Sequence, residues 1–548
     1  MVKFRKEILV LLVLVLIGAY LRFFGLNWGL PYYLNGDEAQ LVAATARLQT
    51  NWDPGFYHWG TLTLFMLGFF AKLASFFVNL SVKSLENVTF IFTLARSISA
   101  TLGVLTIPLI FLVGRKLYNE RVGLLAAALI TFTVLLIQLS HFYMAEGSFV
   151  FFSLLAFYFI IDIYKKGDNR SYYLAAFFLA IAAAAKYTAT LLLSVFLVAH
   201  LLRDKNYKSL LSKRVYLSAA IYIVTFLILT PYLIVNFQGF YKDLSFDSSI
   251  ISGAHKISFT LPFEGSLPYI YHITDTLRWA LGLPLELLAL LGIAYAFRKR
   301  DPSDILLLTA ALVYFLVIGA QFSKFIRYIA VILPFFVLLG SRVLTSLYEN
   351  WTGYRQKFIA GLGAIVLLSS VFYSFAFLNI YAQPDSRVAA IDWINTNIPQ
   401  SSVVASDSEM PFNPKWVKPE NFQSRLIDFV YLYGEQNNSY LDAAPELFTP
   451  PRNLTINEKQ LYFSKVIVEV DYIVLTDTYY DRYRGIQDSK YMPERQFFEN
   501  LFLARSGFKQ EKEFKSYPSL FGIVVNDSNS EASFRTFDHP AVYIFKKA

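Results

Sequence analysis

The 548-residue chain contains no cysteine, and charged residues make up only 16% of it. The missing cysteines exclude disulfides, thiol catalysis and cysteine-ligated zinc, but they do not fix the compartment, because many exported domains lack disulfides. The sequence also has no P-loop, no GxGxxG segment after a strand, no HExxH segment and no EF-hand loop. These absences argue against nucleotide hydrolysis and zinc hydrolysis.

What the chain has in excess is apolar surface. Hydrophobic residues make up 55% and aromatic residues 17% of the sequence, and the mean hydropathy is +0.44. Several apolar runs approach the length of about 20 residues that a bilayer core requires. A soluble core of this size could not bury so much apolar surface. The composition therefore predicts a polytopic membrane protein whose main solvent is lipid.

The net charge of +9 reflects membrane topology and not a nucleic-acid footprint. Lys and Arg cluster in short loops between apolar runs, as the positive-inside rule describes for cytoplasmic loops. The basic start of the chain is followed by an apolar stretch, which is also typical of a cleaved signal peptide. A retained anchor is favoured, because Leu21 to Trp28 offers no small-residue cleavage site.

About twelve apolar runs lie between Ile8 and Leu378. If the run Thr61 to Val78 crossed the bilayer, every basic loop after the first would fall outside; if it lies at the interface, all of them fall inside. We therefore predict an α-helical polytopic protein of the plasma membrane with about eleven spans and an outer juxtamembrane helical segment, Trp52 to Asn79. The N-terminus is expected in the cytoplasm and the C-terminal domain outside it.

Two domains are predicted. Residues 1–382 form the transmembrane domain, in which Val122 to Ser140 and Leu277 to Phe297 are each expected as one helix, the second kinked at Pro284. Residues 383–548 form an extracytoplasmic α/β domain, because charges, Pro and Asn rise there and no run is long enough to span. VAAIDWINTNIP predicts a helix, whereas SSVVAS, VDYIVLT, FGIVV and AVYIF predict short strands.

Three carboxylates are expected at the outer face, where one could act as a general base: Asp37, Glu38 and Glu146. Asp37 and Glu38 follow the first span in the turn YYLNGDEAQ, and Glu146 begins another helix in SHFYMAEG. A solvated helix N-terminus would equally explain the Asp-Glu pair. Glu146 lies among aromatic residues, where a carboxylate is costly unless it is used or paired.

Cations on the same face are candidates for binding a phosphate: Arg96, Lys186, Lys324 and Arg327. For each one alone, snorkelling to the membrane interface is an alternative. A second tier of polar residues lies on the outer segments: His58, His255, Lys256, His272 and Arg278. Glu286, inside a predicted span, is interpreted as a member of a structural pair.

This constellation resembles the GT-C class of membrane glycosyltransferases, in particular protein O-mannosyltransferases and the lipid A aminoarabinose transferase. The resemblance covers about Ile8 to Leu378 and rests on GDE, YHWGTL, ARSISATLG, SHFYMAEG, AAAAKYTA and FIRYIAVILP. It implies that Asp37 is the catalytic base, with Glu38 beside it and Glu146 at the second acidic position. Many relatives have Asp at that second position. The C-terminal domain looks unlike the β-trefoil of the eukaryotic mannosyltransferases.

The resemblance implies an inverting hexosyl- or pentosyltransferase of the cell envelope that moves a sugar from a polyprenyl-phosphate donor to an acceptor hydroxyl on the non-cytoplasmic face. The acceptor could be a glycan, a lipid or a protein; membrane lipids are expected partners and nucleic acid is not. No cofactor is assigned with certainty and no residue is assigned to a metal, but carboxylate oxygens could bind a divalent cation. The alternatives are a transporter or flippase of lipid-linked saccharides and a non-catalytic scaffold.

Overall fold

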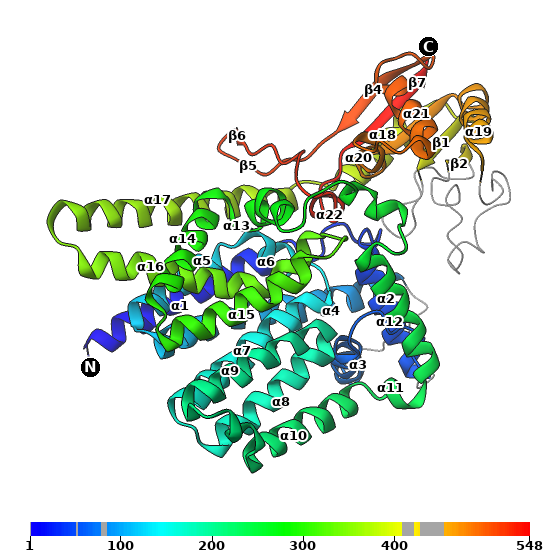
Figure 1. Ribbon diagram of the computed structural model, residues 1–548. Coiled ribbons are helices and arrows are strands. Elements are labelled where there is room, and N and C mark those ends of the chain that lie inside the picture. The colour runs from blue at the N-terminus through cyan, green and yellow to red at the C-terminus, as the bar shows by residue number, and fades with distance from the viewer. Residues whose placement is uncertain (1, 51–52, 78–84, 408–420, 428–453) are drawn as a thin grey trace.

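The computed structural model describes residues 2–50, 53–77, 85–407, 421–427 and 454–548. A large helical bundle occupies the first two thirds of the chain, and a smaller region with both helices and strands follows it (Figure 1). Of the predicted outer segment Trp52 to Asn79, residues 52, 78 and 79 lie outside the described residues.

The bundle contains seventeen α-helices in the described part of the chain, joined by short loops and 3-10 turns. They are α1 (Val2–Phe23), α2 (Gly36–Thr50), α3 (Leu62–Ala74), α4 (Leu85–Leu117), α5 (Glu120–Thr131), α6 (Val134–Gln138), α7 (Ala145–Lys165), α8 (Asn169–Ala185), α9 (Leu193–Asp204), α10 (Lys213–Leu229), α11 (Tyr232–Val235), α12 (Phe237–Ser252), α13 (Arg278–Leu281), α14 (Leu283–Lys299), α15 (Pro302–Gly319), α16 (Leu333–Asn350) and α17 (Gly353–Leu378). The 3-10 turns η1 (Tyr187–Leu192) and η5 (Ile326–Ile332) precede α9 and α16.

Six of the described helical segments are long and apolar enough to cross a membrane, or seven if one bent pair is a single span. The chain therefore has the helices of a multi-pass membrane protein, while the count of about eleven spans stays a prediction. Several expected spans are short or interrupted: α8 and α10 have 17 residues each. The segment expected at the interface forms the 13-residue apolar helix α3.

The prediction of one helix over Val122 to Ser140 is wrong. The run divides into α5 and α6, because the backbone leaves the helical conformation at Phe132 and Thr133. The run Leu277 to Phe297 is also two helices, which meet at an angle of 117°. The break lies at Gly282, whose φ is +78°, and Pro284 stands in the first turn of α14, where its missing N–H costs nothing.

Burial differs sharply between helices and indicates which ones face lipid. In the most apolar window of the segment Ile326–Asn350, which contains α16, 94% of residues are buried, whereas the segment Gly353–Asn397, which contains α17, has 28%. Leu362, Ile365 and Leu368 of α17 are exposed large apolar side chains. An apolar helix surface of this kind is stable in lipid and costly in water.

The C-terminal region is built on a five-stranded sheet of order β2-β1-β3-β7-β4. Strands β1, β2 and β3 run parallel, and β7 is antiparallel to both β3 and β4. The elements are α18 (Ser386–Asn397), β1 (Val403–Asp407), β2 (Gln423–Ile427), α19 (Ile456–Glu469), β3 (Tyr472–Thr476), α20 (Asp477–Arg484), α21 (Met492–Phe502), β4 (Phe508–Phe514), β5 (Ser519–Leu520), β6 (Ile523–Val524), α22 (Ala532–Thr536) and β7 (Val542–Lys547).

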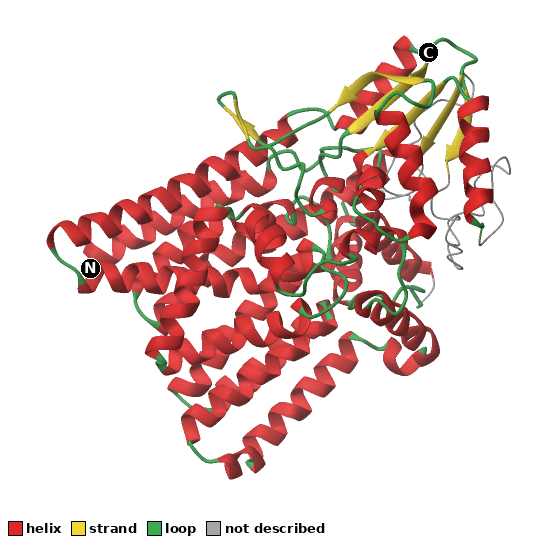
Figure 2. Ribbon diagram, turned by 45° about the horizontal axis from the view of Figure 1, so that its top comes forward, coloured by secondary structure: helices red, strands yellow, loops and turns green. Residues whose placement is uncertain are grey.

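Most of the secondary structure expected for this region is present. VAAIDWINTNIP lies in α18, and SSVVAS, VDYIVLT and AVYIF supply β1, β3 and β7. FGIVV supplies only β6, part of a separate two-stranded hairpin with β5. Figure 2 shows the strands of the main sheet gathered above the helical bundle, with the β5–β6 hairpin apart from them. The domain boundary at residue 383 stays a prediction; the chain passes there from a 3-10 turn into α18.

Candidate active site

The first turn of α2 holds two adjacent carboxylates. The side chain of Asn35 accepts a hydrogen bond of 3.1 Å from the backbone N–H of Glu38 and so caps the helix. Gly36 begins α2, and Asp37 and Glu38 follow it. Successive residues of a helix project about 100° apart. The two carboxylates therefore face different neighbours.

Glu38 is fully enclosed and pairs with Arg96 of α4. The Nη2 and Nε atoms of Arg96 lie 2.7 and 2.9 Å from the carboxylate, and its Nη1 donates to the carbonyls of Leu26 and Trp28, both at 2.8 Å. The backbone N–H of Tyr143 donates to the same carboxylate at 2.9 Å. A phosphate-binding role for Arg96 stays a prediction, but it would require these bonds to break.

Asp37 faces a different set of neighbours, which includes both acidic and basic side chains. Its Oδ2 lies 2.8 Å from Nη1 of Arg327 in η5, and Nε of the same guanidinium lies 3.9 Å from Oε1 of Glu146 in α7. That Oε1 lies 2.7 Å from Nζ of Lys186, the residue directly after α8. Four segments that are remote in sequence thus bring two carboxylates and two cations together. We call these four residues, Asp37, Glu146, Lys186 and Arg327, the charged cluster.

The charged cluster is mostly buried but not sealed. The side chains of Asp37, Arg327 and Lys186 are 12 or 13% exposed, and that of Glu146 is 4% exposed. Burial raises the pKa of Asp37 above its ordinary value, and the nearby Arg327 only partly offsets this. A carboxylate with a raised pKa is a better proton acceptor than an ordinary aspartate.

A close backbone approach fixes Lys186 beside the loop before α3. The backbone N–H of Gly60 donates to the carbonyl of Ala185 at 3.2 Å. A Cβ atom on Gly60 would lie 1.8 Å from the carbonyl oxygen of Ala184, so no other residue fits there. The ammonium of Lys186 also lies 4.9 Å from the ring centre of Tyr328. The end of α8 is thereby held against both the loop and η5.

His58 is near enough to Asp37 for their charges to interact, and it contacts two acidic residues of α12. Its Nδ1 lies 2.9 Å from Asp247, and its Nε2 lies 3.7 Å from Asp243. Burial disfavours the charged imidazole, but the hydrogen bond and charge of Asp247 outweigh it and raise the pKa of His58. Our sequence reasoning missed both aspartates. Their signal was the four-residue spacing within the long segment predicted to lie outside, which places them on one helix face.

The other expected residues have partners of their own outside the charged cluster. Lys324 is buried and donates to the carbonyl of Phe322 at 2.9 Å. Lys256 pairs with Glu264 at 2.8 Å. The remaining three have these neighbours: the ring centres of His255 and Phe246 are 5.9 Å apart, His272 is hydrogen-bonded to Thr276 at 3.0 Å, and the guanidinium carbon of Arg278 lies 5.9 Å from the ring centre of Trp279.

The carboxylates do not fit a metal ion in their present arrangement. Among the described residues, no group of three or more His, Asp or Glu side chains is placed to hold one. Asp37 and Glu146 each face a cationic side chain, and Glu38 is taken by Arg96.

Residues 70–234 match the family model of dolichyl-phosphate-mannose-protein mannosyltransferase. The oligosaccharyltransferase of Archaeoglobus fulgidus, solved with a tethered acceptor peptide, matches with a TM-score of 0.51 and 14% identity over 95% of this chain and 75% of that one. ArnT of Cupriavidus metallidurans, bound to undecaprenyl phosphate, matches with a TM-score of 0.51 and 11% identity over 98% of this chain and 97% of that one. The chain has the GT-C fold.

The GT-C fold agrees with the resemblance inferred from the sequence motifs. At 11 to 14% identity these structures show the fold alone. No curated protein matches the chain significantly in sequence. The match to ArnT covers nearly all of both chains, so it takes in the C-terminal region as well as the GT-C bundle.

Proposed function

We propose that the chain is an inverting glycosyltransferase that moves a sugar from a polyprenyl-phosphate donor to an acceptor hydroxyl. The observation that carries the proposal is the charged cluster, in which a buried carboxylate with a raised pKa contacts an arginine beside a second acid and a lysine. Solved structures with the same fold support the donor class, since ArnT was solved with undecaprenyl phosphate and the archaeal oligosaccharyltransferase with a dolichol-phosphate.

Asp37 acts as the general base in the proposed reaction. Its carboxylate takes the proton of the acceptor hydroxyl, whose oxygen forms a bond to the anomeric carbon from the face opposite the phosphate. The bond between that carbon and the phosphate oxygen breaks, and polyprenyl phosphate leaves with the electron pair. Because one displacement occurs, the anomeric configuration inverts.

Arg327 and Lys186 stabilise the negative charge that develops on the departing phosphate. Arg327 offers a planar fork of donors to phosphate oxygens, and Lys186 offers a compact charge. Glu146 holds Lys186 at 2.7 Å, which orients the ammonium before the donor arrives. Electrostatic stabilisation of developing charge is often the largest single contribution to catalysis. Lys324, three residues before Arg327 and ahead of η5, is a further candidate for binding the donor phosphate.

Glu38 and Arg96 are proposed to hold the backbone that carries Asp37 in place. Their ion pair joins the first turn of α2 to α4, and Arg96 also ties down the carbonyls of Leu26 and Trp28. The loop that leads from α1 to Asp37 is thus fixed at both ends. His58, with Asp243 and Asp247, is proposed to line the acceptor side. The donor sugar, hexose or pentose, and the acceptor, glycan, lipid or protein, follow from no single residue.

The orientation in the membrane belongs to the same proposal. The charged cluster is expected on the non-cytoplasmic face of a multi-pass plasma-membrane protein, with the N-terminus in the cytoplasm and the C-terminal region outside. The bundle alone is also compatible with a transporter or flippase of lipid-linked saccharides, which would move the lipid without breaking its bond to the sugar.

The test compares three purified proteins in detergent with a panel of polyprenyl-phosphate sugars and hydroxyl acceptors. These are the wild type, Asp37→Asn and the control Asp392→Asn, which changes an exposed aspartate on α18. We expect transfer by the wild type and the control, with inverted product, and loss of turnover in Asp37→Asn. Full turnover by Asp37→Asn would remove Asp37 as the base. Lipid movement across vesicles without any transfer would favour the transporter.

A further inference from the structure

A short C-terminal segment reaches the charged cluster from outside the bundle. This segment, residues 531–539, consists of Glu531, the helix α22, Phe537, Asp538 and His539, and we call it the bracket. In Figure 1, α22 lies between the sheet region and the helical bundle. Phe534 and Phe537 are at most 2% exposed and belong to the main apolar core of the bundle.

Two side chains of the bracket contact the segment that carries Arg327. The carboxylate of Glu531 accepts a hydrogen bond of 3.0 Å from the backbone N–H of Ile326, the residue before Arg327 and the first of η5. The ring centre of Phe537 lies 5.6 Å from the guanidinium carbon of Arg327. One contact fixes the backbone directly before Arg327, and the other places an aromatic ring next to its guanidinium.

The bracket also touches the other side of the charged cluster through Arg387 of α18. This fully buried arginine donates to the carbonyl of Leu34 at 3.3 Å, three residues before Asp37. The same guanidinium donates to the carbonyls of Thr536 and Phe537 at 3.1 and 3.3 Å. Arg387 therefore links the bracket to the loop that precedes Asp37. The bracket and Arg387 together contact the segments that carry both partners of the ion pair between Asp37 and Arg327.

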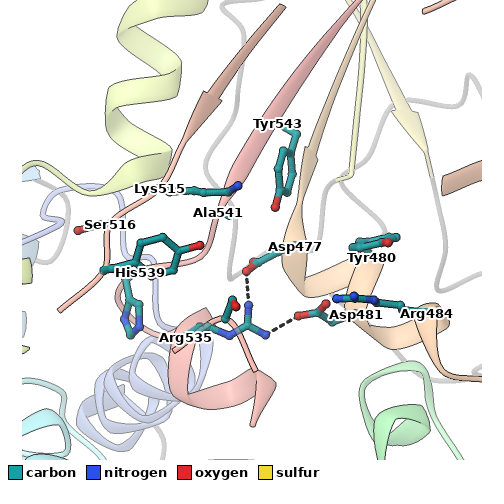
Figure 3. A pocket seen from close by; sticks show the side chains of 12 residues that line it. Asp477, Tyr480, Asp481, Arg484, Lys515, Ser516, Arg535, His539, Ala541 and Tyr543 are labelled. Atoms are coloured by element: carbon teal, nitrogen blue, oxygen red, sulfur yellow. Dashed lines mark hydrogen bonds and ion pairs between the residues drawn. The ribbon is translucent and has the colours of Figure 1, made fainter. Parts of the chain in front are cut away.

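The outer side of the bracket is anchored by charges. Figure 3 shows Arg535 between Asp477 and Asp481, two residues of α20 that contact its guanidinium, and His539 beside them. His539 also contacts Asp538 and lies 2.8 Å from Asp527. Burial disfavours the charged imidazole, but the two carboxylates raise the pKa of His539 to about 10, so it is a cation at neutral pH.

The bracket is further joined to the bundle by Asp538. Its carboxylate accepts a hydrogen bond of 2.7 Å from the hydroxyl of Tyr381 and one of 2.9 Å from the amide of Gln138 in α6. Gln138 also donates to the carbonyl of Phe534 at 2.7 Å. A segment tied on every side in this way has little freedom to shift without moving its contacts.

We infer that Glu531 and Phe537 are positioning residues of the charged cluster, and that they hold Arg327 where it can receive the donor phosphate. The inference rests on the proposed function, which gives Arg327 its role. The C-terminal region then supplies part of the transferase site and is more than an attached domain. Glu531 acts through the hydrogen bond to Ile326, and Phe537 acts through its ring over Arg327.

A hydrogen bond from Ile326 needs an acceptor but not a charge, which suggests the decisive variants. The Glu531 carboxylate also accepts a hydrogen bond of 3.0 Å from the backbone N–H of Ser533, through its other oxygen. Glu531→Gln keeps one oxygen, which can still accept from Ile326 while the bond from Ser533 is lost, and should retain most of the turnover. Glu531→Ala removes the acceptor and should lower kcat about tenfold to a hundredfold, because small misplacements of a reacting group cost rates of that order. Phe537→Leu keeps the apolar volume but not the ring, and should weaken binding of undecaprenyl phosphate about fivefold.

Matched controls separate positioning from a general loss of stability. Glu494 is a fully buried carboxylate of the same region that pairs with Lys459 at 2.9 Å, and Phe508 is a fully buried phenylalanine of β4. Both belong to the C-terminal region, and neither contacts the charged cluster. Glu494→Ala and Phe508→Leu should destabilise that region without changing kcat or the binding of undecaprenyl phosphate in the protein that stays folded.

A third readout follows from the charges that face Asp37, namely Arg327, Glu146, Lys186 and His58. Arg327 lowers the pKa of Asp37, so its displacement in Glu531→Ala should move the acid limb of the kcat/KM profile to higher pH. Glu494→Ala should leave that limb in place. A purely structural role for Glu531 would not move it.

The experiment measures sugar transfer, binding of undecaprenyl phosphate, pH profiles and thermal unfolding for the wild type and these variants. The expected pattern is retention in Glu531→Gln and specific loss in Glu531→Ala and Phe537→Leu. If the wild type is active and Glu531→Ala behaves like Glu494→Ala, the inference alone is overturned. If the wild type neither transfers sugar nor binds the lipid phosphate, the proposed function fails and the inference falls with it.

Discussion

Asp37 and Glu38 are neighbours in sequence, yet they belong to opposite kinds of site. Glu38 and Arg96 are at most 3% exposed and form one tight pair, and backbone groups take up further bonds of both side chains. Asp37 shares Arg327 with Glu146, and these side chains keep limited exposure. A saturated pair is suited to holding structure, whereas a cluster with shared charge can rearrange when a substrate arrives. A buried charge therefore indicates function when its partners are shared with other charges, as for Asp37, and structure when they form one closed pair, as for Glu38.

The largest effect is expected from Asp37→Asn. Loss of a general base costs about a hundredfold to ten-thousandfold in rate, and the isosteric amide should leave the fold intact. Turnover with a saturating polyprenyl-phosphate sugar, measured beside thermal unfolding, checks this. If Asp37→Asn unfolded as readily as Glu38→Gln, Asp37 would have the same structural role as Glu38, and the distinction between a catalytic and a structural carboxylate would be refuted.

The next largest effect is on stability, at the saturated pair. Glu38→Gln leaves the buried guanidinium of Arg96 without its counter-charge, and breaking such a buried pair costs about 3–5 kcal/mol. We expect a markedly lower melting temperature in detergent, with turnover per folded molecule largely retained. Unchanged unfolding combined with lost donor binding would instead give Arg96 the phosphate-binding role that the sequence suggested.

Arg327→Gln should lower kcat about a hundredfold to a thousandfold, as the loss of one stabilising donor does in other enzymes. The effect should appear in kcat and in the affinity for undecaprenyl phosphate, because the guanidinium meets the phosphate before and after transfer. Steady-state kinetics and lipid-phosphate binding test it. Equal losses in an Arg278→Gln control, which changes an arginine outside the charged cluster, would refute a specific role.

The smallest effect is a displacement of the pH profile. Burial raises the pKa of Asp37, so kcat/KM should fall as the pH drops through that raised value and should do so above the range of an ordinary aspartate. His58→Gln removes a nearby positive charge that lowers the pKa of Asp37, and should shift the acid limb slightly further toward higher pH. Profiles of the wild type and this variant, measured at several salt concentrations, provide the check.

The sequence predicted the membrane class and the family resemblance because both depend on local patterns. Apolar runs and short motifs such as GDE and FIRYIAVILP are readable one segment at a time. The prediction of one helix over Val122 to Ser140 failed, because no residue in the run indicates that the helix breaks at Phe132. The sequence also did not point to Glu531, because this residue is remote in sequence from Asp37, Glu146, Lys186 and Arg327.

The sequence by itself determined which residue types were available at the helix ends predicted to lie outside, and it placed Asp37, Glu146, Lys186 and Arg327 among them. Only the tertiary structure decided how they pair. A side chain's partner depends on which segments meet, and segments separated by tens or hundreds of residues meet through packing of the whole bundle. That packing gave Arg96 to Glu38, Arg327 to Asp37, and the bracket to both sides of the charged cluster.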